Sequence, residues 1–312
     1  MHAAQIKKYG DPSVVEVTDI ATPTISDDQV LVAVHASSLN PFDTTMREGR
    51  AQQMSPLRPP FTLGGDIAGV VEAVGAKVTD FAVGDRVFGQ ANAIAGNSGA
   101  LAEHAATAST QIAIAPSNLN FAQAASLPLV GVSALQALTE HIELRAGQKI
   151  LITGGAGGIG RSAIQLAKHL GAYVATTVGT SDIETVTALG ADEAIDYTSQ
   201  DFTELLSGYD AVFDTVGSEE FSKALGILRR GGMAVSMIAQ VDQARADELG
   251  VTAVSQFTQV TTAKLSRLRE LVEAGAIKPQ VGKIFALRNI RDAFVARESG
   301  AVSGKIVIAI RD

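Results

Sequence analysis

One stretch, residues 150–160, constrains the fold of this chain more than any other. It reads Ile-Leu-Ile-Thr-Gly-Gly-Ala-Gly-Gly-Ile-Gly, and an amphipathic helical sequence follows over 161–168. The glycines satisfy G-x-G-x-x-G, in which the first permits a tight strand-to-helix turn, the second lets a pyrophosphate approach the backbone, and the third lets the helix pack closely on the strand. The alternative, a glycine-rich turn without a ligand, is disfavoured by a second strand expected over 172–178. We predict dinucleotide-binding contacts at Gly155, Ala156, Gly157, Gly158, Ile159 and Gly160.

The end of that second strand bears on which dinucleotide binds. NAD sites usually place a carboxylate there for the ribose 2′-OH, but here the chain continues Val178-Gly179-Thr180-Ser181, and no carboxylate comes before Asp182. This favours NADPH, with Thr180 and Ser181 as candidate contacts. Two observations count against it. The only Lys or Arg after Arg161 in this stretch is Lys168, on the helix, and residues 181–184 form an S-x-x-E capping box that could simply start a helix.

Composition restricts the function further. At 312 residues the chain can form one large domain or two ordinary ones. Its net charge of −8 comes with no basic cluster, so nucleic acid is not expected as a partner. Its start lacks a signal-peptide pattern and no apolar run reaches the length of a membrane helix, so we expect a cytoplasmic protein. It has no cysteine and five scattered histidines, so no thiolate zinc site is possible and no metal is expected.

The chain changes texture along its length. Residues 1 to about 120 read as short strands broken by glycine and proline, which predicts a mainly antiparallel unit. Two helices split at Pro128 follow, and then strands alternate with helices, which predicts a doubly wound parallel sheet. A helix ends at Gly231-Gly232 in this reading. We therefore expect an α/β protein with a first domain over 1–122, completed by 279–312, and a second over 123–278. Expected strands are 149–153, 173–178, 193–196, 211–215, 234–238, 281–285 and 305–310, and expected helices 158–170, 182–189, 201–206, 219–228, 261–274 and 289–298.

The order of motifs resembles a known family. The chain carries Ser-Leu-Asn-Pro-Phe-Asp at 38–43, Leu-Gly-Gly-Asp-Ile-Ala-Gly at 63–69, Val-Gly-Asp-Arg-Val at 83–87, the glycine turn, Asp-Thr-Val-Gly at 214–217 and Gly-Lys-Ile-Val at 304–307. It is similar to the zinc-free quinone oxidoreductases, such as ζ-crystallin, among the medium-chain dehydrogenases/reductases. The resemblance implies a GroES-like substrate domain, a Rossmann domain and a homodimer. Zinc-bearing relatives have a Cys near Asn40 and a His-Glu pair where this chain has Gly65-Asp66.

The chemistry agrees with this resemblance. Hydride addition to an isolated carbonyl concentrates charge on one oxygen, which zinc commonly stabilises. Without metal the acceptor must spread that charge by conjugation, so we predict an NADPH-dependent reductase of a quinone or other conjugated carbonyl. An enoyl-thioester reductase and a non-catalytic NADPH-binding protein are the alternatives.

The resemblance also indicates residues of the first domain. It implies that Asn40 faces the cofactor as a catalytic residue, whereas an Asn-Pro turn is the alternative. Relatives often have Tyr where this chain has Thr45, so the sequence leaves the proton donor unidentified, with the Thr45 hydroxyl and water as the candidates. We expect Asp43 to cap a helix over 44–48 and Asp66 to orient Arg47.

Further cofactor contacts are expected in both domains. By resemblance, one segment passes beside the nicotinamide, although helix packing explains it equally well, and a tyrosine flanks the adenosine phosphate unless it lies at a core edge. Strand ends four and five sit where ligands bind in doubly wound sheets. A lysine near the C-terminus reaches a cofactor phosphate or is a solvated residue before an edge strand. The segment beside the nicotinamide contains Val130 and Ser133, and the tyrosine is Tyr197. The fourth strand ends at Thr215, Val216 and Gly217, the fifth at Ile238 and Ala239, and the lysine is Lys305.

Overall fold

The structure is a computed structural model that describes residues 1–54, 57–217 and 219–311. The chain divides into two compact units. The first comprises Met1–Leu129, Val260–Glu273 and Pro279–Asp312, and the second comprises Val130–Gln259 and Ala274–Lys278. Residues 123–129 and 260–273, which the sequence division gave to the second domain, therefore belong to the first unit.

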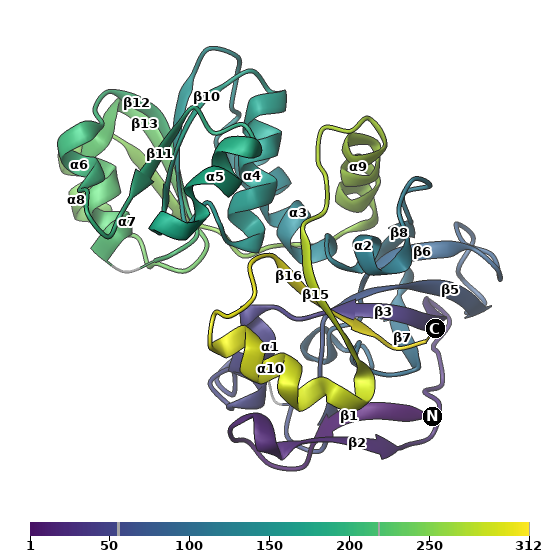
Figure 1. The fold of residues 1–312 in the computed structure, drawn as a ribbon. Coiled ribbons are helices and arrows are strands. Elements are labelled where there is room, and N and C mark those ends of the chain that lie inside the picture. The colour runs from purple at the N-terminus through teal and green to yellow at the C-terminus, as the bar shows by residue number, and fades with distance from the viewer. Residues whose placement is uncertain (55–56, 218, 312) are drawn as a thin grey trace. The chain divides into compact units, whose positions relative to one another are not determined.

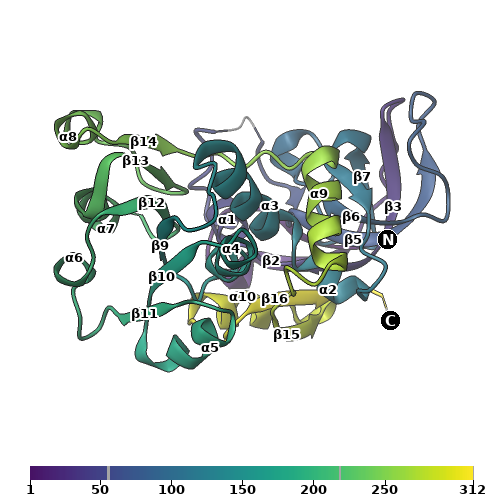
Figure 2. The ribbon, with the colours of Figure 1, turned by 90° about the horizontal axis from the view of Figure 1, so that it is seen from above.

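The second unit contains a parallel six-stranded sheet in the order β11-β10-β9-β12-β13-β14 (Figure 2). This is the strand order 3-2-1-4-5-6 of a doubly wound nucleotide-binding fold, so the expected fold class is confirmed. The order reverses between β9 and β12, and ligands of such sheets bind at the carboxyl ends of these strands. The strands are β9 (Lys149–Thr153), β10 (Tyr173–Val178), β11 (Glu193–Asp196), β12 (Tyr209–Asp214), β13 (Leu228–Ser236) and β14 (Thr252–Ser255).

Helices cover both faces of this sheet, with α4 and α5 on one face and α7 and α8 on the other (Figures 1 and 2). The face of α4 against β9 and β10 buries Ala163, Ile164 and Leu166, which accounts for its amphipathic sequence. The helices are α3 (Pro128–Gln136), α4 (Gly158–His169), α5 (Ile183–Ala188), α6 (Phe202–Leu205), α7 (Glu219–Ala224) and α8 (Gln243–Leu249).

The expectation that a helix ends at Gly231-Gly232 is wrong. The helical stretch ends with a short 3-10 turn, Leu225–Ile227, and both glycines lie inside β13. Gly231 has φ +76°, and the register of β13 against β12 shifts between Tyr209 and Ala211. Gly231 and Gly232 therefore lie in the irregular first part of strand β13.

The first unit is built around a mostly antiparallel seven-stranded sheet and a three-stranded sheet. One edge of β3 pairs with β5, and the other is shared between β7 and β16. The predicted return of the last strand to the first domain is confirmed, because Val307 of β16 pairs with Ser38 of β3. The strands are β1 (His2–Ile6), β2 (Val15–Asp19), β3 (Gln29–Ser38), β4 (Phe61–Thr62), β5 (Asp66–Val74), β6 (Arg86–Gln90), β7 (His104–Ala108), β8 (Ile112–Ile114), β15 (Val281–Ala286) and β16 (Lys305–Ala309).

Four helices pack in this unit, and one core joins α1 and α10 to the small sheet. Met46 of α1 and Phe294 of α10 are buried with Ile6 and Phe61 in that core. No helix in the described part of the chain is long and apolar enough to cross a membrane. The helices are α1 (Pro41–Arg47), α2 (Phe121–Ala125), α9 (Thr262–Glu273) and α10 (Ile290–Glu298).

Candidate active site

The glycine turn joins β9 to α4 in the geometry its sequence predicts. Gly154 has φ +71°, a backbone conformation that residues other than glycine rarely adopt. A Cβ on Gly155 would lie 2.1 Å from the Thr176 Oγ1 atom, and one on Gly160 would lie 2.3 Å from the Gly154 carbonyl oxygen, so strand and helix approach as closely as glycine allows. The first N–H groups of α4, beginning at Gly158, have no partner within the helix. The turn therefore fits a pyrophosphate.

A buried aspartate, which the sequence reading did not assign to the site, organises the neighbouring strand ends. Asp214 closes β12 and is fully buried. Its carboxylate accepts hydrogen bonds from Thr153 Oγ1 (2.6 Å) and Ser236 Oγ (2.6 Å), and from the backbone N–H of Gly217. Asp214 thus links the ends of β9, β12 and β13. An aspartate that ends an apolar strand ahead of a Thr-Val-Gly turn is the signal that could have found it.

The same network holds the predicted contacts at the ends of β12 and β13. Thr215 Oγ1 donates to the Thr153 carbonyl (2.7 Å), and the N–H groups of Ile238 and Ala239 donate to Ser236 Oγ. Val216 and Ile238 are 49% and 64% exposed, so these strand ends present apolar side chains on the surface of the unit.

The end of β10 differs in part from expectation. Ser181 lies in a 3-10 turn, Thr180–Asp182, and no side chain caps α5, so the capping-box reading is wrong. Thr180 Oγ1 donates to Asp196 Oδ2 (2.5 Å), a carboxylate from the end of β11 that the sequence reading missed. Hydrogen bonds from Thr180 and Thr198 hold the pKa of Asp196 below its usual value. Tyr197 is 64% exposed, so it is not a core-edge residue.

Two candidates lie on α3 and are buried. Val130 is 6% exposed and Ser133 is fully buried. Ser133 Oγ lies 2.7 Å from Thr258 Oγ1, and the Ser133 carbonyl accepts from Gln256 Nε2 (3.0 Å). These contacts are helix packing, and a cofactor contact of either residue stays a prediction.

In the first unit, Asn40 lies at the centre of a buried polar network. It is 2% exposed and is the N-cap of α1. Its Nδ2 atom donates to Asp66 Oδ2 (2.8 Å), and its Oδ1 atom accepts from Lys305 Nζ (2.6 Å). Because lysine only donates and a carboxylate only accepts, the amide has one orientation. The N–H group of Asn40 donates to Asp43 (2.7 Å), so Asp43 occupies the third helical position and the prediction that it is the N-cap is wrong.

Lys305 is buried and also donates to the Leu39 carbonyl (2.9 Å). Its strand, β16, pairs on both sides, so the alternative of a solvated lysine before an edge strand is wrong. Its amine lies 3.9 Å from Asp66 Oδ2. Burial lowers the pKa of Lys305, and the nearby Asp66 opposes this shift. Burial raises the pKa of Asp43 to about 7.

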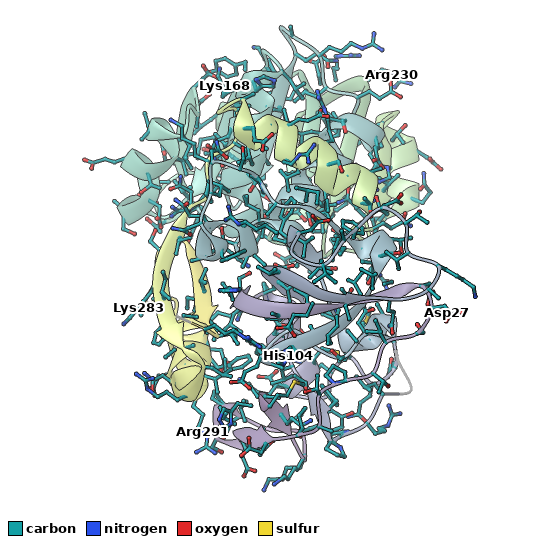
Figure 3. The ribbon with its side chains drawn as sticks, turned by 90° about the vertical axis from the view of Figure 1, so that its right-hand side faces the viewer. Asp27, His104, Lys168, Arg230, Lys283 and Arg291 are labelled. Atoms are coloured by element: carbon teal, nitrogen blue, oxygen red, sulfur yellow. The ribbon has the colours of Figure 1, made fainter. Side chains whose placement is uncertain are left out.

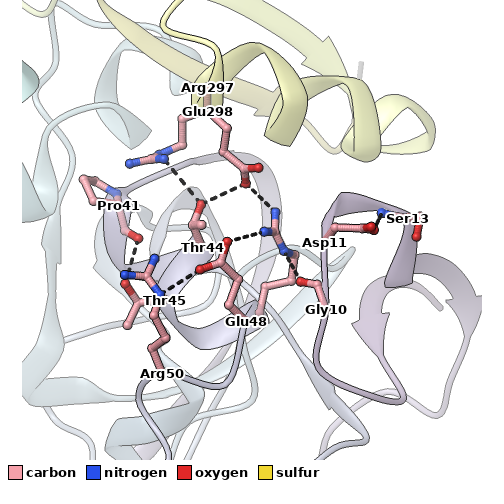
Figure 4. Close-up of polar contacts among 11 residues, drawn as sticks. Gly10, Asp11, Ser13, Pro41, Thr44, Thr45, Glu48, Arg50, Arg297 and Glu298 are labelled. Atoms are coloured by element: carbon pink, nitrogen blue, oxygen red, sulfur yellow. Dashed lines mark hydrogen bonds and ion pairs between the residues drawn. The ribbon is translucent and has the colours of Figure 1, made fainter.

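The predicted contact between Asp66 and Arg47 is wrong. Asp66 accepts instead from Ser38 Oγ, Gln90 Nε2 and the Leu129 N–H, besides Asn40. The Arg47 side chain is bound by other partners, shown in Figure 4 as Gly10, Glu48 and Glu298.

Thr45, the candidate proton donor, is hydrogen-bonded within α1. Thr45 Oγ1 donates to the Pro41 carbonyl (3.3 Å; Figure 4), and the residue is half-buried.

His104 (labelled in Figure 3) pairs with Glu72 (3.0 Å) and contacts Arg311. Over 1–54, 57–217 and 219–311, no three His, Cys, Asp or Glu side chains form a group that could hold a metal ion.

Comparison with known proteins agrees with this architecture. Residues 26–117 match the alcohol dehydrogenase GroES-like domain and residues 189–308 match a zinc-binding dehydrogenase family. The chain is 37% identical to 2-methylene-furan-3-one reductase of Solanum lycopersicum and 37% identical to an NADPH-dependent alkenal/one oxidoreductase, chloroplastic, of Arabidopsis thaliana. Each match covers 99% of this chain and 79% of the relative. The quinone oxidoreductase of Coxiella burnetii superposes with a TM-score of 0.92 at 33% identity, covering 100% of this chain and 99% of that one.

The doubly wound sheet with its glycine turn, joined to a GroES-like unit, defines an oxidoreductase of the dehydrogenase/reductase class. The chain belongs to the medium-chain dehydrogenase/reductase family, in the branch of the quinone and alkenal/one oxidoreductases.

Proposed function

We propose that this oxidoreductase uses NADPH, without a metal ion, to reduce either the conjugated double bond of α,β-unsaturated carbonyl compounds or a quinone to its hydroquinone. The carrying observation is the glycine turn, where close packing at Gly155 and Gly160 holds the start of α4 against β9, and the first N–H groups of that helix suit a pyrophosphate. Relatives matched over 99% of the chain, one named as NADPH-dependent and both as reductases or oxidoreductases of conjugated carbonyls, support the same reaction. We assign coenzyme binding to the second unit and substrate binding to the first.

The proposed coenzyme contacts follow from the strand ends. The turn 155–160 would hold the pyrophosphate, Thr180, Ser181 and Tyr197 would hold the adenosine end, and 215–217, 238 and 239 would line the path toward the nicotinamide. The reduced nicotinamide, when bound, supplies a hydride. Addition of that hydride to the β-carbon of an enone, with one proton added next to the carbonyl, yields the saturated ketone.

The proposed part of Asn40 is to orient the reacting groups. Lys305 on Oδ1 and Asp66 on Nδ2 fix its amide, and one N–H of Nδ2 remains for a carbonyl oxygen. Hydrogen bonds in a chain polarise one another, so the ammonium on Oδ1 strengthens that donor. Thr45, whose hydroxyl donates to the Pro41 carbonyl, or a water molecule would supply the proton.

The proposal of metal-free turnover rests on the donor set. The chain has no cysteine, and the position after Gly65 holds Asp66, whose carboxylate already accepts four hydrogen bonds. We predict that dialysis against a strong chelator leaves the turnover rate within about twofold, a difference of under 0.5 kcal/mol in activation free energy. Metal analysis of the dialysed protein is the control, and loss of activity restored by zinc would contradict the proposal.

The direct test follows NADPH absorbance after mixing the protein with three acceptors in parallel: a medium-chain 2-alkenal, a small quinone and a 2-enoyl thioester. Turnover of the alkenal or the quinone is the expected result. Turnover of the thioester alone would assign an enoyl-thioester reductase. Tight binding of NADPH without turnover of any acceptor would indicate a binding protein.

We also propose that the protein is a homodimer. Strand β14 pairs only with β13 among the described strands, and Phe257 beyond its end is 70% exposed. An open sheet edge beside an exposed aromatic side chain is suited to pairing with a second copy. The cytoplasmic location and the lack of nucleic-acid partners stay predictions from the sequence.

A further inference from the structure

No Lys or Arg follows the second strand of the nucleotide-binding sheet until well past the ribose position, so the strand end itself offers no cation to a 2′-phosphate. The structure brings one there from the helix. Arg161 is the fourth residue of α4, and its guanidinium turns back past the glycine turn, where Nε donates to the Ala156 carbonyl (2.6 Å). Its Nη2 atom lies 3.5 Å from Asp182 Oδ1, in the 3-10 turn that follows β10.

This position lies between the two segments that a dinucleotide contacts in a doubly wound sheet. The pyrophosphate lies over the glycine turn, and the 2′ position of the adenosine ribose lies at the end of the second strand, where NADP sites use an arginine. Arg161 touches the first segment through Ala156 and the second through Asp182. Thr180 and Ser181, in the same 3-10 turn as Asp182, are exposed.

Arg161 is more buried than Asp182, its ion-pair partner. The Arg161 side chain is 6% exposed, whereas Asp182 is 27% exposed. Burial lowers the pKa of the Arg161 guanidinium, and Asp182, 3.5 Å away, opposes this shift. The nearby Asp196 carboxylate is satisfied by Thr180 and by the hydroxyl and N–H of Thr198, so it does not compete for the guanidinium.

We propose that Arg161 is the specificity-determining residue for the 2′-phosphate of NADPH, and that Asp182 holds its guanidinium in place until the phosphate replaces that carboxylate. This inference rests on the proposed function for the presence of a dinucleotide. A guanidinium binds phosphate through two parallel N–H groups, which a 2′-hydroxyl cannot match. The competing explanation is that Arg161 only braces the helix against the turn through Ala156.

Calorimetric titration with 2′,5′-ADP and with 5′-AMP separates these explanations without any turnover. The wild-type protein should bind 2′,5′-ADP at least about tenfold more tightly, the discrimination expected of a charge-assisted pair. Arg161→Met should reduce this preference to about twofold or less while 5′-AMP affinity changes little. Asp182→Asn should raise 2′,5′-ADP affinity severalfold, because the competing carboxylate is gone.

Arg145→Met is the control, since Arg145 lies in the same unit and forms an ion pair with Glu143 (3.7 Å) of similar length to that of Arg161 with Asp182 (3.5 Å). It should leave both affinities unchanged. If Arg161→Met does not fold by circular dichroism, Arg161→Lys, which keeps the charge but loses the planar fork, and Asp182→Asn carry the test.

Three results would overturn the role of Arg161 while dinucleotide binding stands. The preference for 2′,5′-ADP could survive in Arg161→Met or its substitute, or the variant could lose affinity for both nucleotides equally. The third is a wild-type protein that binds both nucleotides equally well. A wild-type protein that binds neither nucleotide would overturn the proposed coenzyme, and the inference with it.

Discussion

Asp43 shows how one buried carboxyl group links the site to stability. Its pKa is raised to about 7, first by burial, whereas an unfolded aspartate titrates near 3.8. The folded protein therefore binds this proton more tightly than the unfolded chain. Stability from this group is fully present below about pH 4 and is lost as the pH rises toward about 7, by up to the order of 4 kcal/mol.

Asp43→Asn should remove that pH dependence while its amide oxygen still accepts from the Asn40 N–H. Urea unfolding across pH 4 to 8 should show the variant gaining stability relative to wild type as the pH rises. Asp11→Asn is the control, because hydrogen bonds from Ser13 lower the pKa of the exposed Asp11, and its contribution has the opposite sign (Figure 4). A pH-independent difference for Asp43→Asn would show that this carboxyl is not protonated in the folded state.

Lys305→Met tests whether this lysine positions Asn40 or holds a phosphate. Its amine donates to Asn40 Oδ1 and the Leu39 carbonyl, so its loss should lower kcat about 10- to 100-fold with little change in the NADPH dissociation constant. Steady-state kinetics and fluorescence titration separate the two quantities. Lys283→Met, at an exposed lysine of β15 (Figure 3), is the control. A large loss of NADPH affinity with kcat retained would assign Lys305 to the coenzyme.

At this scale the sequence predicts local contacts well and distant ones poorly. The glycine turn is encoded within eleven consecutive residues, so its geometry follows from their order. The bond from Lys305 to Asn40 joins residues 265 apart, and the Ser133–Thr258 contact joins residues 125 apart. No periodicity or spacing reports such pairs, which is why Lys305 could be expected as solvated and Asp66 as a partner of Arg47.

Among whole elements, the short β-branched strands are the most predictable. The bounds of β9, β10 and β11 match the expected ranges, because each is a short apolar or β-branched run that ends at turn residues. Strand β13 begins earlier than expected because Leu228 already pairs with Tyr209 of β12, and Gly231 and Gly232 lie in the irregular stretch before the regular register resumes at Met233. Helix α8 and strand β14 fall in a stretch, 240–260, without a clear pattern in the sequence.

The close packing of β9 against α4 depends on Gly160. Gly160→Ala places a methyl 2.3 Å from the Gly154 carbonyl oxygen, so helix and strand must separate. We expect a loss of about 1–3 kcal/mol in the free energy of unfolding and at least a tenfold loss of NADPH affinity. Gly226→Ala is the matched control, because nothing lies within 4 Å of its added Cβ and its φ is ordinary. Urea unfolding and calorimetry measure both effects, and unchanged coenzyme binding in Gly160→Ala would contradict the assigned role of the turn.

Assembly is a property of the whole molecule, and the open edge of the sheet in the second unit favours association with a second copy. Among the described strands β14 pairs only with β13, and an open edge of this kind is normally protected by charged side chains or by a cover. Here the strand Thr252–Ser255 carries no charge and is followed by Phe257, which is 70% exposed. A two-fold axis beside β14 would cover both the edge and the aromatic ring with the same surface of a second copy.

Phe257→Asp should therefore weaken the dimer at least tenfold, because an aromatic side chain at the centre of an interface commonly contributes more than about 1.4 kcal/mol and the new carboxylate would face its symmetry mate. Sedimentation equilibrium measures the association. Leu205→Asp, at a 51% exposed position on α6, is the control for an added surface charge and should leave the dimer intact. Dissociation by Leu205→Asp together with a stable Phe257→Asp dimer would move the interface to the α6 side of the unit. A wild-type protein that sediments as a monomer would leave the β14 edge as a solvent-exposed strand.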